Sequence, residues 1–253
     1  MLPTEIALIV FACVFGGALL GMFLRVVTPE HHLSRDSQEV IKLGMGLIAT
    51  MAALVLGLVI ATAKSSYDTQ DAAVKHSAAK VLLLDRVLAN YGPETQETRD
   101  LLRRIVASRV DAIWPEDRSQ PARSDGPEAV PTALEFEARI LQLAPQTDAQ
   151  RWLQSQALQI SSDLKETRWL VLGGRGSSVP LPFLVVVVFW LTIIFGSFGL
   201  FAPRNGTVVA VLFLCALSLA GSIFLILEMD QPFQGLMKIS SAPLRYTLSQ
   251  LGQ

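Results

Sequence analysis

The residues of this chain that are best suited to chemistry stand together in Glu30–Asp36, which has the sequence EHHLSRD. His31 and His32 lie beside two acids, and His32 and Asp36 would share one face if the segment were helical. A metal site needs about three or four ligands in fixed geometry. This segment is a short loop between two apolar runs. We therefore expect a solvated polar loop and no metal site.

The sequence carries no motif that is typical of an enzyme. It contains no GxSxG, HExxH, P-loop or paired CxxC pattern. The GGRG at 173–176 lacks the preceding strand and the following Lys-Ser that a phosphate-binding loop requires. The prediction is a protein that is not an enzyme, with no catalytic residue, no metal and no cofactor.

Glu228 and Asp230 are the remaining candidates for a chemical role. They directly follow the uncharged run Thr207–Leu227, and Pro232 comes shortly after them. One interpretation is a stop signal for a membrane helix with cap-like hydrogen bonds. The other is a ring of carboxylates, repeated by symmetry around an oligomer axis, that attracts cations to a pore mouth. The sequence leaves both interpretations open.

The composition is that of a membrane protein with a soluble insert. Of the 253 residues, 51% are hydrophobic and 17% are charged, whereas soluble domains carry about 25% charged residues. Most of the charge lies between Lys64 and Arg175. With 21 basic and 22 acidic residues, the chain has no electrostatic footprint for nucleic acid, and we expect no such partner.

Four apolar runs are long enough to cross a bilayer, which takes about 20 helical residues. They are Ile6–Leu24, Leu43–Ala63, Val179–Phe201 and Thr207–Leu227, with Cys13 and Cys215 as their only ionisable side chains. The predicted fold class is an all-α integral membrane protein, with four transmembrane helices and a helical cytoplasmic bundle between spans two and three. Glycines in these runs indicate close helix packing, within one chain or between subunits. These glycines are Gly17, Gly21, Gly44, Gly46, Gly196 and Gly199.

Four spans place both termini and the central block on one side of the membrane. The basic residues near the span ends on that side are Lys64, Lys75, Lys80, Lys165, Arg168, Arg175, Lys238 and Arg245. Those on the opposite side are Arg25, Arg35, Lys42 and Arg204. The positive-inside rule therefore predicts that the termini and the central block are cytoplasmic.

The central block, 65–172, carries helical patterns. No Pro or Gly interrupts the chain after the second span, so that span is expected to continue as one rod to Gly92-Pro93. A second helix should end at Trp114-Pro115, and capping-box spacing predicts a third from Thr132 (with Glu135) and a fourth from Thr147 (with Gln150). The composition of residues 116–131, rich in Pro, Gly, Ser and charge, predicts a mobile loop. The apolar face of the rod comprises Val74, Ala78, Val81, Leu84, Leu88 and Tyr91.

The segment after the fourth span is predicted to lie on the membrane surface, because Pro232 prevents the helix from continuing. Its apolar side chains would face the bilayer and its two basic residues the lipid head groups. These are Phe233, Leu236, Met237 and Ile239, with Lys238 and Arg245. The predicted domains are spans one and two (1–64), the helical cytoplasmic domain (65–172), spans three and four (173–227) and the tail (228–253).

Three segments resemble a known family. They are GLIATMAALVLGLVIATAKSSYD at 46–68, FGSFGLFAPRN at 195–205 and EMDQPFQGLMKISSAPLR at 228–245. The chain resembles the bestrophin-like family of bacterial and plant membrane proteins, which has no established catalytic residues, and the likeness extends over the rest of the chain. It implies four spans, long helices reaching into the cytoplasm and assembly around an axial ion pore. The expected location is the bacterial cytoplasmic (inner) membrane.

By that resemblance, the chain is similar to a subunit of an oligomeric ion channel or pore. Its partners would be further copies of itself, the lipid bilayer and inorganic ions. The pore-lining candidates are the small residues Ala49, Thr50 and Ala53 of span two, with Phe195 and Phe198 of span three as a hydrophobic constriction. The alternative is a non-conducting membrane scaffold or sensor that binds partners through its cytoplasmic helical domain.

Overall fold

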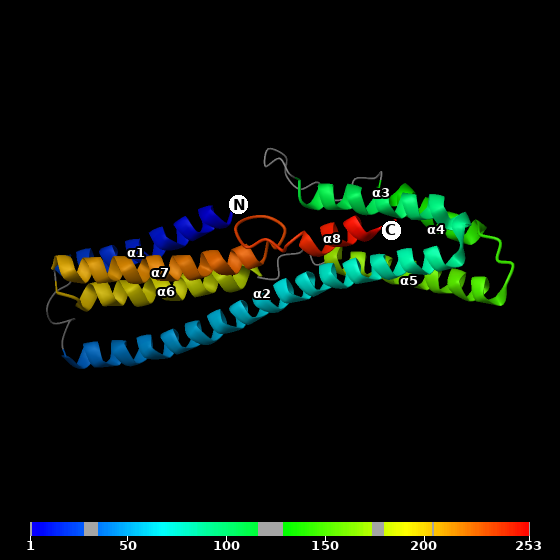
Figure 1. Ribbon diagram of the computed structural model, residues 1–253. Helices are drawn as coiled ribbons and strands as arrows, with labels where there is room; N and C mark the ends of the chain where they lie inside the picture. Colours follow the sequence, from blue (N-terminus) through cyan, green and yellow to red (C-terminus); the bar gives the residue numbers. More distant parts are fainter. Residues whose placement is uncertain (1, 28–34, 116–128, 174–179, 204, 253) are drawn as a thin grey trace. The chain divides into compact units, whose positions relative to one another are not determined.

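The computed structural model describes residues 2–27, 35–115, 129–173, 180–203 and 205–252, and these residues form α-helices and no β-strand (Figure 1). Four of the helices are long and apolar enough to cross a membrane, namely α1, α2, α6 and α7. The predicted fold class, all-α with four transmembrane helices, is therefore confirmed. The elements are α1 (Pro3–Val27), α2 (Arg35–Tyr91), η2 (Pro93–Thr95), α3 (Gln96–Ile113), α4 (Ala129–Gln142), α5 (Asp148–Gly173), α6 (Leu181–Phe201), α7 (Gly206–Met229) and α8 (Ala242–Gln250).

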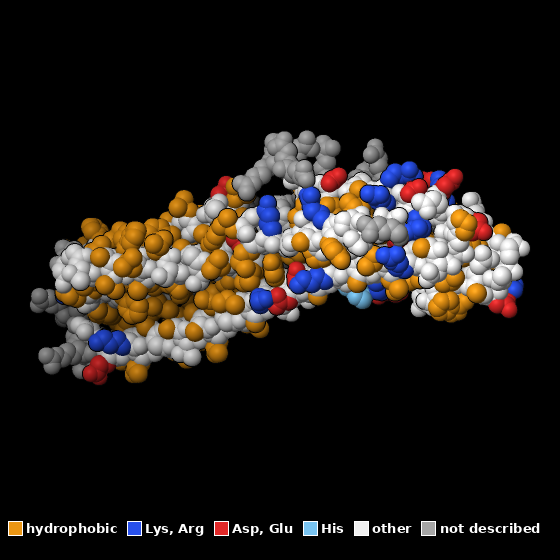
Figure 2. Space-filling view, in the orientation of Figure 1, with side chains coloured by type: hydrophobic (Ala, Val, Ile, Leu, Met, Phe, Trp, Pro, Cys, Tyr) orange, Lys and Arg blue, Asp and Glu red, His pale blue; other side chains and the backbone are white. Residues whose placement is uncertain are grey.

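The chain divides into two compact units, which we describe separately. Unit 1 comprises Met1–Ser66 and Ser177–Asp230, and unit 2 comprises Tyr67–Gly176 and Gln231–Gln253. On the face shown in Figure 2, hydrophobic side chains predominate over unit 1, whereas most of the basic and acidic side chains lie on unit 2. The segment predicted as a separate tail is thus divided, because Glu228–Asp230 end unit 1 and the rest belongs to unit 2.

Unit 1 is held together by close packing of α1 against α6. A Cβ atom added at Gly21 would lie 2.0 Å from the carbonyl oxygen of Gly196, and one added at Gly199 would lie 2.0 Å from that of Ala18. Only glycine permits this approach of two backbones. Gly21 of α1 and Gly199 of α6 therefore pack within the chain. By contrast, a Cβ atom at Gly44 or Gly46 of α2 would meet nothing within 4 Å.

Helix α2 is one continuous helix of 57 residues, as the absence of Pro and Gly after the second span predicted. It ends at Tyr91, and the following Gly92 has a φ of 142°, a conformation that only glycine adopts without strain. The buried hydroxyl of Thr95 then donates to the carbonyl oxygen of Leu88 (2.6 Å), one of the last carbonyls of the helix. The sequence therefore stops this helix at one defined position.

The helices of unit 2 enclose the apolar faces that the periodicity predicted. All six residues assigned to the face of the α2 rod are buried. The cap at Thr147 is also confirmed, since its hydroxyl oxygen accepts from the N–H of Gln150 (3.1 Å). The predicted start at Thr132 is wrong, because α4 begins at Ala129. Of the predicted loop 116–131, residues 116–128 lie outside the described residues and 129–131 are helical.

The segment after Pro232 packs into unit 2, contrary to our prediction of a membrane-surface tail for Phe233 and Ile239. The ring of Phe233 contacts that of Trp114 edge to face, with centroids 5.8 Å apart. The indole N–H of Trp114 donates to the carbonyl oxygen of Ile239 (2.8 Å), whose side chain is buried. The proline turn brings an acceptor to an indole that needs one when buried. Leu236 is 81% exposed.

Candidate functional site

Helix α2 is the span least covered by the rest of unit 1. Of its most apolar window, 11% is buried, against 33% for α1, 33% for α6 and 28% for α7. The three pore-lining candidates of this helix, Ala49, Thr50 and Ala53, are all exposed. The hydroxyl of Thr50 donates to the carbonyl oxygen of Gly46 (2.9 Å), so its polar group is satisfied within the helix. The chain therefore leaves the predicted lining residues on its outer surface.

Successive residues are about 100° apart around a helix. This spacing sorts the residues in the apolar part of α2 into three faces. One face packs against unit 1 through Ala52, Val59 and Ala63. The second, which we call the small-residue face, comprises Gly46, Ala49, Thr50, Ala53 and Gly57. The third, the leucine face, comprises Leu43, Leu47, Leu54 and Leu58, each more than 60% exposed. Two surfaces of different chemistry therefore lie uncovered side by side.

The two phenylalanines predicted as a constriction differ in their surroundings. Their ring centroids are 6.0 Å apart on α6. Phe195 is 5% exposed and belongs to the core of unit 1, whereas Phe198 is 52% exposed. Of the two, only Phe198 is largely exposed. The expected constriction is therefore limited to Phe198, and Phe195 packs beside it in the core of unit 1.

An open hollow brings candidates from two spans together. It has a volume of about 660 Å³ and is lined by α2, α6 and the start of α7, including Ala49, Phe198 and Lys42. Thr50 and Ala53 are not among its lining residues. The small-residue face of α2 thus borders a concave surface that also carries the exposed phenylalanine.

Glu228 and Asp230 lie at the opposite end of α7 from this hollow. Val208, which lines the hollow, is 20 residues from Glu228, which corresponds to about 30 Å along a helix. Glu228 is 4% exposed, whereas Asp230 is half-buried and caps the C-terminus of α7. The two acids therefore differ in exposure, since only Asp230 offers substantial surface.

Most of the other polar candidates of the sequence lie outside the described residues. Glu30, His31 and His32 lie outside the described residues, and so does most of the GGRG segment. Among the residues that are described, no three His, Cys, Asp or Glu side chains lie close enough together to hold a metal ion.

Asp85 and Tyr91 are buried titratable residues of unit 2. The carboxylate of Asp85 is fully buried and accepts two hydrogen bonds from Arg99, at 2.8 and 3.0 Å. These bonds raise the pKa of the Arg99 guanidinium above its usual range, although partial burial opposes the shift. Burial raises the pKa of the Tyr91 phenol, and the charge of Glu94 acts in the same direction. The charges of Asp85 and Arg99 are thus paired within unit 2, whereas the Tyr91 hydroxyl has no hydrogen-bond partner among the described residues.

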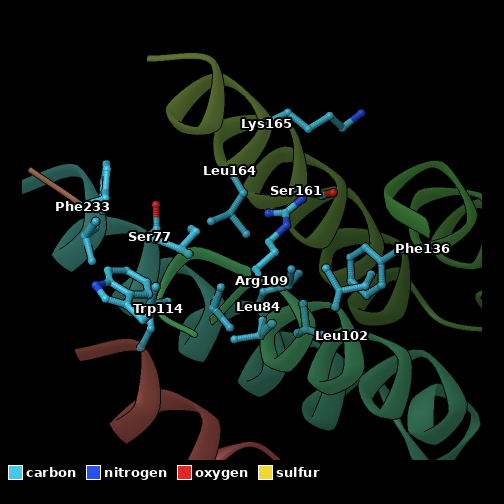
Figure 3. Close-up of a pocket in the computed structure, with 16 residues that line it drawn as sticks. Ser77, Leu84, Leu102, Arg109, Trp114, Phe136, Ser161, Leu164, Lys165 and Phe233 are labelled. Carbon is cyan, nitrogen blue, oxygen red and sulfur yellow. The ribbon is translucent and has the colours of Figure 1, made fainter. Parts of the chain in front are cut away.

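Sequence reasoning missed Arg109. It stands on the apolar face of α3, three residues after Val106 and four before Ile113. The structure places it in the lining of a cavity in unit 2 with mostly apolar walls (Figure 3). A cation at a position where the helical period calls for an apolar side chain is the signal that would have found it.

Comparisons with known proteins agree with this architecture. A sequence profile of the Bestrophin-like domain matches residues 12–244. The fold is similar to a variant of a bacterial bestrophin homologue from Klebsiella pneumoniae, with 15% identity, a TM-score of 0.65 and coverage of 95% of this chain and 99% of that chain. A second variant from that organism gives 16% identity, a TM-score of 0.62 and the same coverage. No curated protein matches this chain.

The four apolar helices and the matching fold define the class as an integral membrane protein with four helical spans. The chain belongs to the bestrophin-like family, because the family profile covers most of its length. The resemblance noted in three segments of the sequence is thereby confirmed.

Proposed function

We propose that this chain is a subunit of a homo-oligomeric ion channel whose pore is lined by the small-residue face of α2. The observation that supports this function is the exposure of α2, whose apolar window is covered by unit 1 much less than those of the other three spans. A span with one buried face and two uncovered faces has surface left for further copies of the chain and for a pore. Membership of the bestrophin-like family is consistent with this proposal.

The two uncovered faces suit different neighbours. Small side chains leave room for ions and water, and the small-residue face borders the hollow that carries Phe198. An exposed aromatic ring beside that face can form a constriction that excludes water when the pore narrows. The leucine face has large side chains that interdigitate well with another helix. We therefore assign the small-residue face and Phe198 to the pore, and the leucine face to the adjacent subunit.

Asp230 is the carboxylate that we assign to the pore mouth. It is half-buried at the end of α7, about 30 Å along that helix from the hollow. A ring of such acids would raise the local cation concentration at one entrance. Glu228 is almost fully buried within the single chain, so its contribution would be to the stability of unit 1 more than to ion selection.

We also propose that unit 2 and both termini are cytoplasmic and that the membrane is the bacterial inner membrane. This orientation rests on the excess of Lys and Arg near the span ends on that side of the chain. Attachment of a membrane-impermeant thiol reagent to a cysteine introduced at the exposed Leu236, in intact cells and in inverted vesicles, tests it. Labelling of this cysteine in intact cells would contradict the proposed orientation and support the opposite one.

The assembly is tested by the mass of the protein purified in a mild detergent, and conduction by ion flux in liposomes. A single-subunit species would contradict the axial pore. An oligomer that passes no ions would instead favour the scaffold or sensor, which binds partners through unit 2. If flux is observed, replacing Asp230 with Asn should lower the preference for cations over anions. Unchanged selectivity would leave Asp230 only its role as a helix cap.

The lining of the pore is tested by single cysteines in a background where the exposed Cys13 and Cys215 are replaced by Ala. A charged thiol reagent should reduce flux through Ala53→Cys, because that position lies on the small-residue face. The matched control is Leu54→Cys, the next residue on the same helix, which lies on the leucine face. Equal block of both variants, or block of the control alone, would refute the assignment of faces.

A further inference from the structure

We infer that unit 1 binds one anionic phospholipid, with an acyl chain in the hollow between α2, α6 and α7 and its phosphate at Lys42. The hollow lies at the end of unit 1 where α2 begins, α6 ends and α7 begins (Figure 1). Apart from Lys42, its lining residues are uncharged and mostly apolar. The site belongs to a single subunit, so binding there does not depend on whether the protein conducts ions.

A second hollow continues the first one along α7. Its volume is about 460 Å³, and it shares Phe198 and Leu212 with the first hollow. We call the two hollows together the groove. Its lining on α7 extends from Thr207 to Leu219, which corresponds to about 18 Å of helix. One leaflet of the hydrocarbon core is about 15 Å deep. The groove is therefore long enough to take one acyl chain from the head-group level to the middle of the bilayer.

The walls of the groove suit hydrocarbon. Val211 and Phe198 line it and are 53% and 52% exposed, so the chain itself leaves them uncovered. The hydroxyl of Ser218 donates to the carbonyl oxygen of Leu214 (2.9 Å), which satisfies this polar group within the helix. Side chains that border an empty space lose their dispersion contacts. A flexible acyl chain that fills the groove restores these contacts.

Two cations lie at the head-group end of the groove. Lys42 is exposed and lines the hollow, and the exposed Arg25 donates to the carbonyl oxygen of Ala202, another lining residue. No acidic residue lines either hollow among the residues that the structure describes. A lysine ammonium binds phosphate as a point charge, and basic residues beside the bilayer attract anionic lipids. A zwitterionic head group also carries a cation, which these two side chains repel, so we expect a preference for a lipid with net negative charge.

The lipid covers only the edge of the small-residue face of α2. Gly46 and Ala49 line the groove, whereas Thr50 and Ala53 do not and stay uncovered for the proposed pore. The acyl chain would also contact Phe198, where the two hollows adjoin. If the proposed channel function is right, occupancy of the groove should therefore influence the constriction. If that function is wrong, the binding of the lipid is unaffected.

Native mass spectrometry of the purified full-length chain in a mild detergent, titrated with dioleoyl phosphatidylglycerol, tests this site. Dioleoyl phosphatidylcholine is the matched ligand, because it has the same acyl chains and no net charge. We expect one phosphatidylglycerol per subunit, bound about 10- to 30-fold more tightly than phosphatidylcholine, as two basic residues near an anionic head group predict. Equal affinity for the two lipids, or no saturation at one lipid per subunit, would overturn the inference.

A pair of lysine variants locates the head group. Lys42→Gln should lower the preference for phosphatidylglycerol by about 5-fold, because it removes one of the two cations. Lys64→Gln is the matched control, since Lys64 is exposed near the other end of the same span, and it should leave the preference unchanged. Loss of the preference in the control alone would place the anionic lipid at the opposite end of the span and refute the assignment.

A pair of tryptophan variants locates the acyl chain. Val211→Trp places an indole in the groove and should weaken the binding of both lipids. Leu217→Trp is its control, because Leu217 is 50% exposed on the same helix and does not line either hollow. Weaker binding in Val211→Trp alone would support the groove as the site. Equal binding in both variants would place the acyl chain elsewhere and contradict the inference.

The mass of the oligomer in the same spectra distinguishes a lipid from a second copy of the chain in the groove. A lipid predicts that Val211→Trp loses bound phosphatidylglycerol while the number of subunits stays the same. If Val211→Trp instead separates the subunits and lipid binding equals that of Leu217→Trp, a neighbouring subunit fills the groove and the inference is wrong.

Discussion

Replacing Gly21 with Ala should weaken unit 1 more than any other single added methyl group on α1. A Cβ at this position would lie 2.0 Å from the carbonyl oxygen of Gly196 and 2.9 Å from the backbone nitrogen of Leu200. Ordinary contacts of a Cβ begin at 3.4 Å, so α1 and α6 would have to separate by about 1.4 Å. Both obstacles are backbone atoms, and no change of rotamer can relieve them.

The expected cost is about 2–3 kcal/mol, the upper part of the range for overpacked cores. Alanine is also a better helix former than glycine by up to about 1 kcal/mol, and this gain would hide part of the loss. Gly16→Ala is the matched control, because Gly16 lies on the same helix and a Cβ there meets nothing within 4 Å. The difference between the two variants isolates the contact with α6.

The measurement is thermal unfolding of both variants in the same detergent, followed by tryptophan fluorescence. For a chain of this size, 2–3 kcal/mol corresponds to a difference in Tm of about 4–12 °C. Gly17→Ala should fall between them, because its Cβ would meet the side chain and the carbonyl oxygen of Thr192 at 2.8 and 2.9 Å. If Gly21→Ala melts at the temperature of Gly16→Ala, α1 and α6 do not approach as described.

Three further predictions concern unit 2. Asp85→Ala should lower the free energy of unfolding by about 3–5 kcal/mol, because it leaves Arg99 buried without its partner. The double variant Asp85→Leu, Arg99→Leu should lose less stability. Chemical unfolding of the single and double variants checks this. Tyr91→Phe should raise stability at neutral pH by about 1 kcal/mol, since the Tyr91 hydroxyl has no hydrogen-bond partner among the described residues. The raised pKa of Tyr91 also predicts that stability falls as pH rises above about 10, where the unfolded phenol loses its proton before the folded one, and that Tyr91→Phe lacks this loss; Tm measured as a function of pH checks it.

The sequence predicted the buried helix faces of unit 2 well, because its helices have one face in water and one face in an apolar core. A helix with one face in water shows a period of 3.6 residues, and all six residues that the period assigned to the α2 rod are buried. The errors fall where local chemistry overrides the period. Thr132 looked like a helix start, yet α4 begins three residues earlier. Phe233 looked like a lipid-facing residue, yet a ring and an N–H of Trp114 hold its segment in unit 2.

The faces of the spans could not be predicted in the same way. Lipid chains and protein interiors are equally apolar, so a transmembrane helix has no hydrophobic period to show which side meets other helices. Hydropathy therefore located all four spans, but it did not show that Phe195 is buried and Phe198 exposed. Glycines were the informative residues, since close approach requires them. Gly17, Gly21 and Gly199 lie in close contact between α1 and α6, whereas a Cβ at Gly44, Gly46 or Gly57 of α2 would meet nothing within 4 Å.

Charged residues on apolar faces carry the information that periodicity leaves out. Asp85 and Arg109 each occupy a position in a buried stripe of unit 2, where an apolar residue would cost nothing in desolvation. The surroundings of these two charged side chains differ. Asp85 receives two hydrogen bonds from Arg99 inside the same unit and needs nothing from outside. Arg109 lines a cavity whose only other cation is already bonded to Glu137, among the residues described. A charged residue in a buried stripe therefore marks either an internal ion pair or the lining of a cavity, and the helical period alone does not tell the two apart.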